Sequence, residues 1–300
     1  MAKPVFRAGS VHIRTPATSA NLGPGFDALG LALDLHDDVV AAISDDGLQV
    51  DVAGEGEQLP RDESHLVIRA MRATFDRLGG QPRGIDLTCA NRIPHGRGLG
   101  SSASAITAGI LLARGLVLGG EQALPTAAVL ALATELEGHP DNVAACILGG
   151  LTVAWTSDGT GRAVRVEGVT GVLPVVAIPP FEASTKTARG LLPESVPHAD
   201  AAFNAGRAAL LIAALTGAPE ALLAATEDRL HQPYRVPAMA ESAALVAALR
   251  ASGHAAVVSG AGPTVLILAR DQVEVHSLSP LIPEGWRAQA LGITAGAHVV

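Results

Sequence analysis

Residues 94–105, PHGRGLGSSASA, set three glycines within five positions directly before an apolar stretch. Gly96, Gly98 and Gly100 cost backbone entropy, so a tight turn or a bound group must require their conformational freedom. If a helix begins near Ser101, the loop delivers unpaired backbone N–H groups to the positive end of that helix, which attracts anions. The stretch therefore predicts a phosphate-binding loop, with an ordinary glycine-rich turn as the alternative.

The serines that follow the glycines add hydroxyl chemistry to the loop. Ser101, Ser102 and Ser104 could cap the helix, donate to a phosphate or ligate Mg²⁺. The spelling excludes two other phosphate loops. A Walker A loop requires a lysine after its last glycine, and a Rossmann loop requires G-x-G-x-x-G where this chain has G-x-G-x-G.

Two further stretches combine glycine with polar residues. TPATSANLGPGFDALGLAL (15–33) places Asn21 and Asp27 on either side of a Gly-Pro-Gly turn. SGAGPTVLIL (259–268) predicts a tight turn between two buried strands. Taken singly, each stretch is typical of a turn, in the first case one formed by Asn and Asp and in the second a hairpin.

The elements that position these loops follow from apolar spacing and from helix stop signals. We expect strands over 11–16, 85–94 and 169–180, helices over 65–80, 101–120 and 125–138, mostly helix through 199–251, and a strand–turn–strand over 255–269. Strands and helices mix without strict alternation, which favours an α+β fold. A compositional shift near 155–170 predicts two domains, 1–160 and 161–300.

Composition narrows the functional classes. The chain has 300 residues, of which 48% are hydrophobic and 17% are charged, so it can bury a large core. A net charge of −8 and the absence of a basic run argue against nucleic-acid binding. The first twenty residues do not resemble a secretory signal, no apolar run suits a bilayer, and the two cysteines have no metal-binding spacing. We expect a cytoplasmic protein without a membrane partner.

Together the three glycine stretches resemble the signature motifs of the GHMP kinases, which include galactokinase, mevalonate kinase and homoserine kinase. PHGRGLGSSASA matches the family's P-x-x-x-G-L-G-S-S-A loop at every fixed position. The resemblance implies an N-terminal domain like ribosomal protein S5, a ferredoxin-like C-terminal domain, and ATP with Mg²⁺ as cofactors. It also implies that the C-terminal turn supports the phosphate loop.

The resemblance implies which residues bind the nucleotide and the metal ion. Ser102 and Glu137 are the expected Mg²⁺ ligands, with Glu135 as the alternative to Glu137. His65, like Val67, stands where the family approaches adenine. The residues expected to bind ATP are Pro94, His95, Gly96, Arg97, Gly98, Leu99, Gly100, Ser101, Ser102, Ala103, Ser104 and His65. Arg97 could add positive charge beside the phosphates or point outward.

Four stretches are most similar to the homoserine kinases, namely 16–33, EGHPDNVAACILGG (137–150), STKTAR (184–189) and HQPYR (231–235). The resemblance assigns substrate binding to residues that suit a small zwitterion. A guanidinium offers paired donors to a carboxylate, and an aspartate accepts an ammonium group. The expected substrate residues are Asn21, Asp27, Asn142, Arg189 and Arg235.

Catalysis by such an enzyme depends mainly on alignment and charge neutralisation, because phosphoryl transfer passes through a loose transition state. Asn142, Asp141, Thr185 and Arg189 are the expected catalytic residues. Asp141 matches the position near which mevalonate kinases carry their base. The resemblance to homoserine kinases implies that a dedicated base is lacking and that the phosphate itself receives the proton. The proton acceptor therefore stays open, and His139 is expected to be a structural histidine.

The expected activity is ATP-dependent phosphorylation of the side-chain hydroxyl of L-homoserine, a step in threonine biosynthesis. One alternative keeps the fold and changes the acceptor to mevalonate or another small alcohol. The other is a catalytically silent metabolite sensor, which would be expected to lose its phosphate-loop or metal residues. The oligomeric state stays open, with a homodimer among the alternatives.

Overall fold

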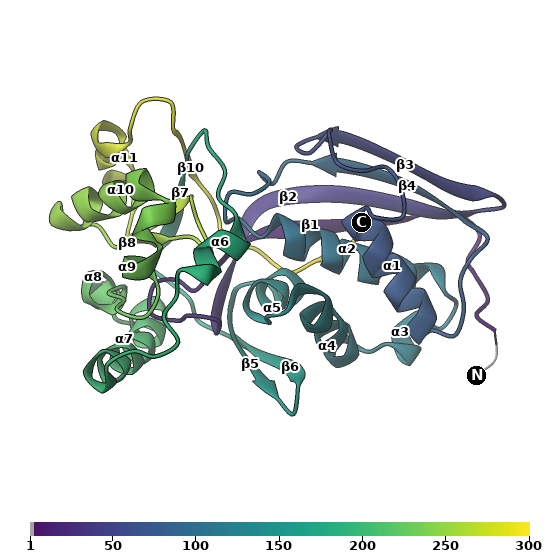
Figure 1. The fold of residues 1–300 in the computed structure, drawn as a ribbon, viewed down its shortest axis with the longest axis horizontal. Coiled ribbons are helices and arrows are strands. Elements are labelled where there is room, and N and C mark those ends of the chain that lie inside the picture. Colours follow the sequence, from purple (N-terminus) through teal and green to yellow (C-terminus); the bar gives the residue numbers. More distant parts are fainter. Residues whose placement is uncertain (1–2) are drawn as a thin grey trace.

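The computed structural model describes residues 3–300 and confirms the α+β class. Figure 1 shows two parts side by side along the longest axis, each built from one sheet and its own helices. A seven-stranded sheet belongs to the N-terminal part and a four-stranded sheet to the C-terminal part. None of the helices within residues 3–300 has both the length and the apolarity needed to cross a membrane.

The first sheet has the order β11-β1-β2-β4-β3, and β5 and β6 extend it from β2. Its strands are β1 (Val11–Ala20), β2 (Leu29–Ser44), β3 (Gly47–Gly54), β4 (Gly84–Asn91), β5 (Leu151–Ser157), β6 (Thr160–Val166) and β11 (His298–Val299). Among the strand pairs of residues 3–300, only β3 and β4 are parallel. The predicted strand over 11–16 continues past Pro16, because the register with β2 shifts between Pro16 and Ala17.

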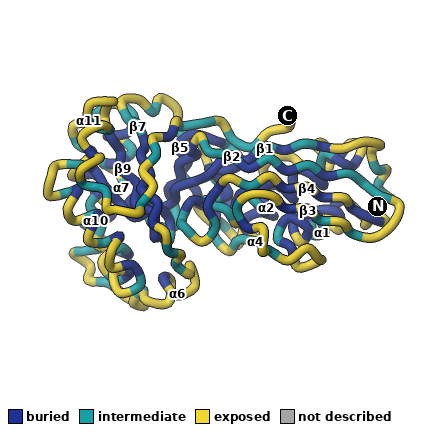
Figure 2. The backbone as a smooth tube through the Cα atoms, turned by 90° about the horizontal axis from the view of Figure 1, so that it is seen from above, coloured by how far each residue is buried: buried dark blue, intermediate teal, exposed yellow. Residues whose placement is uncertain are grey.

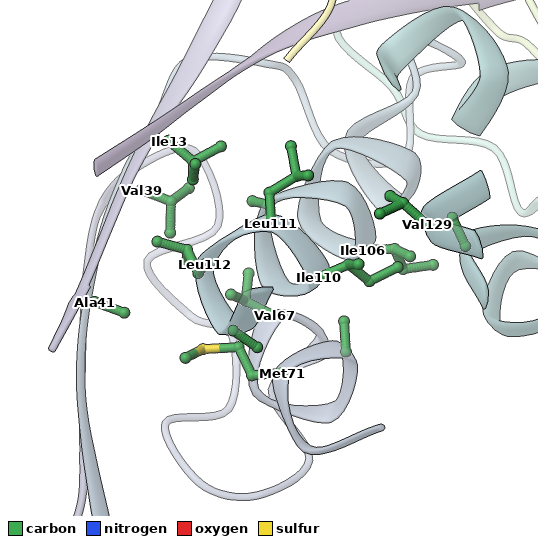
Figure 3. Close-up of a cluster of buried hydrophobic side chains, with 14 of the residues drawn as sticks. Ile13, Val39, Ala41, Val67, Met71, Ile106, Ile110, Leu111, Leu112 and Val129 are labelled. Carbon is green, nitrogen blue, oxygen red and sulfur yellow. The ribbon is translucent and has the colours of Figure 1, made fainter. Parts of the chain in front are cut away.

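Five helices cover one face of this sheet: α1 (Leu66–Arg77), α2 (Ser101–Leu116), α3 (Gly120–Ala123), α4 (Thr126–Glu137) and α5 (Asp141–Leu148). Helix α2 is apolar on most sides and lies in the middle of the core. Figure 3 shows its side chains between Ile13 and Val39 of the sheet, Met71 of α1 and Val129 of α4. This packing fixes the start of α2, where the glycine stretch ends.

The C-terminal sheet is antiparallel with the order β10-β7-β9-β8. Its strands are β7 (Leu173–Ile178), β8 (Ala256–Val258), β9 (Val265–Ala269) and β10 (Arg287–Ala290). The helices are α6 (Thr185–Gly190), α7 (His198–Thr216), α8 (Leu222–Ala225), α9 (Gln232–Arg235), α10 (Ala240–Ala251) and α11 (Gln272–Ser277). Short 3₁₀ turns span Pro219–Ala221, Val236–Ala238 and Ser279–Leu281.

The two parts share buried apolar surface. Leu31 and Leu99 of the N-terminal part belong to the same buried cluster as Val176 and Leu266 of the C-terminal sheet. In Figure 2 the buried backbone runs continuously from one part to the other. We retain the division into 1–160 and 161–300 as a proposal, noting that β6 extends to Val166 and that β11 returns to the first sheet.

Candidate active site

A cavity of about 210 Å³ lies where the two parts meet, and it gathers most of the predicted site residues. These come from the turn after β1, the glycine loop, α2, α4, α5, α6 and α9. The predicted residues that line it are Asn21, Asp27, Gly96, Gly98, Gly100, Ser101, Ser102, Glu137, Asp141, Asn142, Thr185, Arg189 and Arg235. His139, Gly260 and Ala261 complete the lining.

The glycine loop adopts the left-handed backbone conformation that its sequence indicates. The φ angles of Gly96, Gly98 and Gly100 are 63°, 75° and 73°. Helix α2 begins at Ser101, and Gly100 is its N-cap residue without a side-chain cap. The expectation that serines cap this helix is therefore wrong. Because no side chain covers the first turn, its N–H groups can face an anion in the cavity.

The C-terminal turn supports the loop, as the family resemblance implies. The Ser259 hydroxyl donates to the Gly98 carbonyl at 2.6 Å, and the Thr264 N–H donates to the Arg97 carbonyl at 3.2 Å. From the other side, the Thr18 N–H donates to the Leu99 carbonyl at 3.0 Å. A Cβ at residue 98 would collide with the backbone oxygens of Ser259 and Gly262. Only glycine permits this close approach.

Ser102 and Glu137, the predicted Mg²⁺ ligands, lie in contact with each other. The Ser102 Oγ donates to the Glu137 carboxylate at 2.7 Å, although 35 residues separate them. Glu135 points elsewhere, since its carboxylate accepts from Arg77 at 2.6 Å. Mg²⁺ commonly uses one or two protein oxygens together with phosphate oxygens and water. The Ser102–Glu137 pair beside the glycine loop fits that donor set, and residues 3–300 contain no cluster of three or more His, Cys, Asp or Glu ligands.

The turn after β1 is held in place by Asn21. Its side-chain amide donates to the Gly260 carbonyl at 2.9 Å, and its side-chain oxygen accepts from the Asp27 N–H at 3.0 Å. Asn21 and Asp27 both have positive φ angles, of 68° and 54°. Such conformations are uncommon outside glycine and are tolerated best by Asn and Asp. Asn21 thus shapes the cavity wall and places the Asp27 carboxylate.

Asp27 and Arg189 form a bidentate ion pair across the cavity. The two guanidinium nitrogens lie 2.8 and 2.9 Å from the carboxylate oxygens. This hydrogen bonding raises the pKa of Arg189. Both side chains remain partly open to solvent. Each therefore carries a charge that a ligand of matching chemistry can reach.

Arg235 differs, because it is buried without a carboxylate partner. It is 2% exposed, donates to the Gly260 carbonyl at 3.1 Å, and leaves its Nε without a hydrogen-bond partner. Within residues 3–300, no carboxylate oxygen lies within 4.0 Å of its guanidinium. Burial and the nearby Arg189 charge lower the pKa of Arg235. A buried cation that lines a cavity and lacks an anion is a built-in anion site.

An aromatic platform supports both guanidinium groups. The Phe26 ring lies 5.6 Å from the Arg189 Cζ and 5.4 Å from the Arg235 Cζ. His231 stacks on the same ring at 5.1 Å, and its Nε2 lies 2.8 Å from the Gly23 carbonyl oxygen. Burial lowers the pKa of His231 and so disfavours its charged form. This stack fixes α9 against the turn that carries Asp27.

The start of α5 contributes a histidine–aspartate pair. The Asp141 carboxylate lies 2.6 Å from the His139 Nδ1 and accepts the Asn142 N–H at 2.8 Å. Burial acts to lower the pKa of His139, but the Asp141 carboxylate outweighs it and the pKa is raised. The Asn142 side-chain oxygen accepts from the Thr18 hydroxyl at 2.7 Å, which leaves the amide N–H groups for the cavity. Thr185 lies at the start of α6.

A second cavity, of about 280 Å³, adjoins the glycine loop. The predicted residues His65, His95 and Ser104 line it together with Gly96, Ser101 and Ser102, and its remaining walls are largely apolar. Both ring nitrogens of His65 are buried without a partner, and burial lowers its pKa. A flat heteroaromatic ring with hydrogen-bonding edges fits this chemistry.

Other residues of the predicted nucleotide set line neither cavity. Leu99 and Ala103 are buried in the core, and Pro94 lies at the entry to the loop. The Arg97 guanidinium binds the carbonyl oxygens of Pro179 and Pro180 instead of facing the glycines. Of the two alternatives considered for Arg97, charge beside the phosphates and an outward-pointing side chain, the geometry matches neither.

Several site residues escaped prediction from the sequence. Thr18 orients Asn142, while Gly260 accepts from both Asn21 and Arg235. Phe26 lies one residue before Asp27, in the quoted motif, and the guanidinium groups of Arg189 and Arg235 lie over its ring. All three lie within the quoted motifs, and this position was the available signal. The roles of Thr18 and Gly260 are visible only through their long-range contacts.

Comparison with known proteins places this geometry in a family. The family model described as GHMP kinases N terminal domain matches residues 65–150, and the one described as GHMP kinases C terminal matches residues 203–279. A homoserine kinase of Streptomyces avermitilis is 62% identical over 100% of this chain and 99% of its own length. That of Clavibacter michiganensis subsp. michiganensis is 53% identical over 97% and 93% of the two chains.

A solved structure agrees with these matches. The homoserine kinase from Cytophaga hutchinsonii superposes with a TM-score of 0.86 at 26% identity, covering 99% of both chains. The L. major mevalonate kinase, at 18% identity and a TM-score of 0.68, shares the fold over 98% of this chain and 99% of its own. The chain therefore belongs to the GHMP kinases, in the branch formed by the homoserine kinases.

Proposed function

We propose that this chain transfers the γ-phosphoryl group of ATP to the side-chain hydroxyl of L-homoserine, as the name homoserine kinase of the two relatives above suggests. The observation that carries the proposal is Arg235, a buried guanidinium without a carboxylate, which lines the same cavity as Asp27 and the glycine loop. A zwitterion with a terminal hydroxyl supplies an anion for Arg235, a cation for Asp27 and an acceptor for the phosphoryl group.

Substrate binding is proposed to exchange one ion pair for others. Asp27 and Arg189 neutralise each other in the structure. An α-ammonium group would take the place of the guanidinium at Asp27, and an α-carboxylate would bind Arg189 and Arg235. Every charge then keeps a partner. An acceptor without the ammonium would either draw Arg189 away and leave Asp27 unpaired, or bind Arg235 alone while Arg189 stays with Asp27. This exchange favours a zwitterion over mevalonate.

For the nucleotide, the glycine loop and the first turn of α2 would hold the phosphates, and the cavity beside His65 would take the base. Ser102 and Glu137 would hold Mg²⁺. The ion neutralises phosphate charge and holds the phosphate oxygens when it is bound. Asn142 and Thr185 would orient the hydroxyl. Its proton would pass either to Asp141, which already accepts two hydrogen bonds, or to the phosphate itself.

An ADP-release assay with four acceptors tests the proposal. L-homoserine should turn over fastest. 4-Hydroxybutyrate lacks the ammonium group and 3-amino-1-propanol lacks the carboxylate, so each should lose at least about tenfold in kcat/KM. A higher kcat/KM for mevalonate than for L-homoserine would contradict L-homoserine as the substrate. ATP binding without turnover of any acceptor would favour the sensor.

Asp27→Asn should raise the KM for L-homoserine about tenfold or more, because it removes a charge-assisted partner of the ammonium group. The KM for 4-hydroxybutyrate should stay the same or fall, since Arg189 loses its competing carboxylate. Steady-state kinetics with both acceptors measures this change in preference. A parallel rise for both acceptors would contradict the proposed role of Asp27.

Combining Ser102→Ala with Glu137→Gln should raise the Mg²⁺ concentration for half-maximal activity about tenfold or more, because both proposed protein ligands are removed. Glu135→Gln is the matched control, since Glu135 lies two residues away and pairs with Arg77. The measurement is a Mg²⁺ titration at constant ATP. An unchanged Mg²⁺ requirement in the double variant would assign the metal to other residues.

A further inference from the structure

Arg97 lies within the glycine loop, but its side chain contacts the C-terminal part. Its guanidinium donates to the carbonyl oxygens of Pro179 and Pro180 at 3.0 Å each and to that of His95 at 2.9 Å. The Arg97 Nη1 also donates to the Glu182 carboxylate at 3.3 Å. The Arg97 side chain is 18% exposed, whereas that of Glu182 is 64% exposed. The neutral carbonyls are therefore its principal partners.

The Pro179 and Pro180 carbonyls belong to the segment that connects β7 to α6, whereas His95 lies in the glycine loop itself. The segment is also bound by the loop backbone, because the Ala183 N–H donates to the Gly96 carbonyl at 3.1 Å. Directly after it, the Ser184 hydroxyl accepts the Thr187 N–H and caps α6. Helix α6 presents Thr185 and Arg189 to the cavity. The Arg97 side chain thus connects the glycine loop to the segment that leads into α6, the helix proposed to bind the substrate.

We propose that Arg97 is a positioning residue that holds α6 at a fixed distance from the glycine loop. This inference rests on the proposed function, because it assigns α6 to the acceptor and the loop to the phosphates. On this assignment, α6 would hold the acceptor hydroxyl and the glycine loop would hold the γ-phosphate. Phosphoryl transfer requires them in line, and a displacement of about 1 Å can cost about 100-fold in rate.

The alternative role for Arg97 is simple positive charge beside the phosphates. The two roles predict different results when lysine replaces Arg97. A lysine retains the charge but presents a compact ammonium group in place of the planar fork that reaches three carbonyls. If Arg97 acts through charge, Arg97→Lys should retain activity and Arg97→Gln should raise the KM for ATP. If Arg97 positions α6, both variants should fail alike, and on the acceptor side.

The experiment compares Arg97→Lys, Arg97→Gln and the control Glu182→Gln in steady-state kinetics with ATP and L-homoserine. We expect both Arg97 variants to raise the KM for L-homoserine about tenfold or more and to lower kcat by up to about 100-fold. The KM for ATP should stay within about twofold, as should all constants of Glu182→Gln, because that contact is exposed. A rise confined to the KM for ATP, or full activity of Arg97→Lys, would overturn the proposal.

Amide hydrogen exchange provides a readout that does not depend on the substrate. In Arg97→Lys, residues 181–190 should exchange faster than in the unmodified chain, while α2 stays protected. Unchanged exchange in 181–190 would overturn the positioning role, as would general loss of protection with a lowered Tm. If the unmodified chain does not phosphorylate L-homoserine, the proposed function fails, and this exchange measurement still decides whether Arg97 holds α6.

Discussion

Gly100→Ala is expected to raise the KM for ATP at least about 100-fold, which corresponds to roughly 3 kcal/mol. Gly100 has a φ of 73°, and the added Cβ would collide with the Thr18 hydroxyl and lie 3.2 Å from the Asn142 side-chain oxygen. A left-handed alanine alone costs about 1–2 kcal/mol. The collision displaces the residue that caps α2, so the loop loses the shape that receives phosphate.

Gly96→Ala is the matched control for this prediction. Gly96 has a similar φ of 63°, but the nearest atom to its added Cβ belongs to the Glu182 side chain, at 3.4 Å. Both variants thus carry the same kind of backbone strain, and only one carries the collision. Fluorescence titration with a labelled ATP analogue measures both affinities. Equal losses in the two variants would attribute the effect to strain, and unchanged affinity in Gly100→Ala would remove the loop from the nucleotide site.

Arg235→Leu is expected to raise the KM for L-homoserine at least about 100-fold, because two charge-assisted hydrogen bonds of about 1.5 kcal/mol or more each are lost. The KM for ATP should change by less than about threefold, since Arg235 is proposed to bind the carboxylate of the acceptor and not the nucleotide. Replacing a buried cation that has no carboxylate partner by an apolar side chain should not lower Tm. Steady-state kinetics with each substrate varied in turn measures both constants.

The acceptor 3-amino-1-propanol is the control for Arg235, because it has no carboxylate to lose. Its KM should be nearly the same with the unmodified chain and with Arg235→Leu. The variant should therefore abolish most of the preference for L-homoserine over this analogue. An equal rise for both acceptors would show that Arg235 acts on the shape of α9 through Phe26 and not on the carboxylate.

The parts of the site that sequence predicted correctly are local ones. The glycine loop could be predicted because the backbone freedom of Gly96, Gly98 and Gly100 is a property of those residues alone. The helices around it followed from apolar spacing, and α2 begins at the expected Ser101. The serine caps were predicted wrongly, because a left-handed Gly100 takes the cap position and frees the hydroxyls for other partners.

The parts that sequence could not predict are contacts between distant segments. Asp27 and Arg189 are 162 residues apart, and the pattern indicated a role for each but not their ion pair. The Ser259 hydroxyl donates to the Gly98 carbonyl across 161 residues, and the family resemblance implied that these two segments meet but not which groups bind. Arg97 was included among the nucleotide-binding residues because it lies in the glycine loop. The structure instead places the carbonyl oxygens of Pro179 and Pro180, directly after β7, within hydrogen-bond distance of its guanidinium. No periodicity in one segment encodes such partners.

The most direct test of the proposed activity is ³¹P NMR of a reaction containing ATP, Mg²⁺ and L-homoserine. The proposed site places the acceptor hydroxyl beside the phosphate loop, so a phosphomonoester signal should appear in equal amount with ADP. Coupling of this phosphorus to two methylene protons would identify the side-chain oxygen as the acceptor. Formation of inorganic phosphate alone, or of no product while ATP persists, would contradict phosphoryl transfer to L-homoserine.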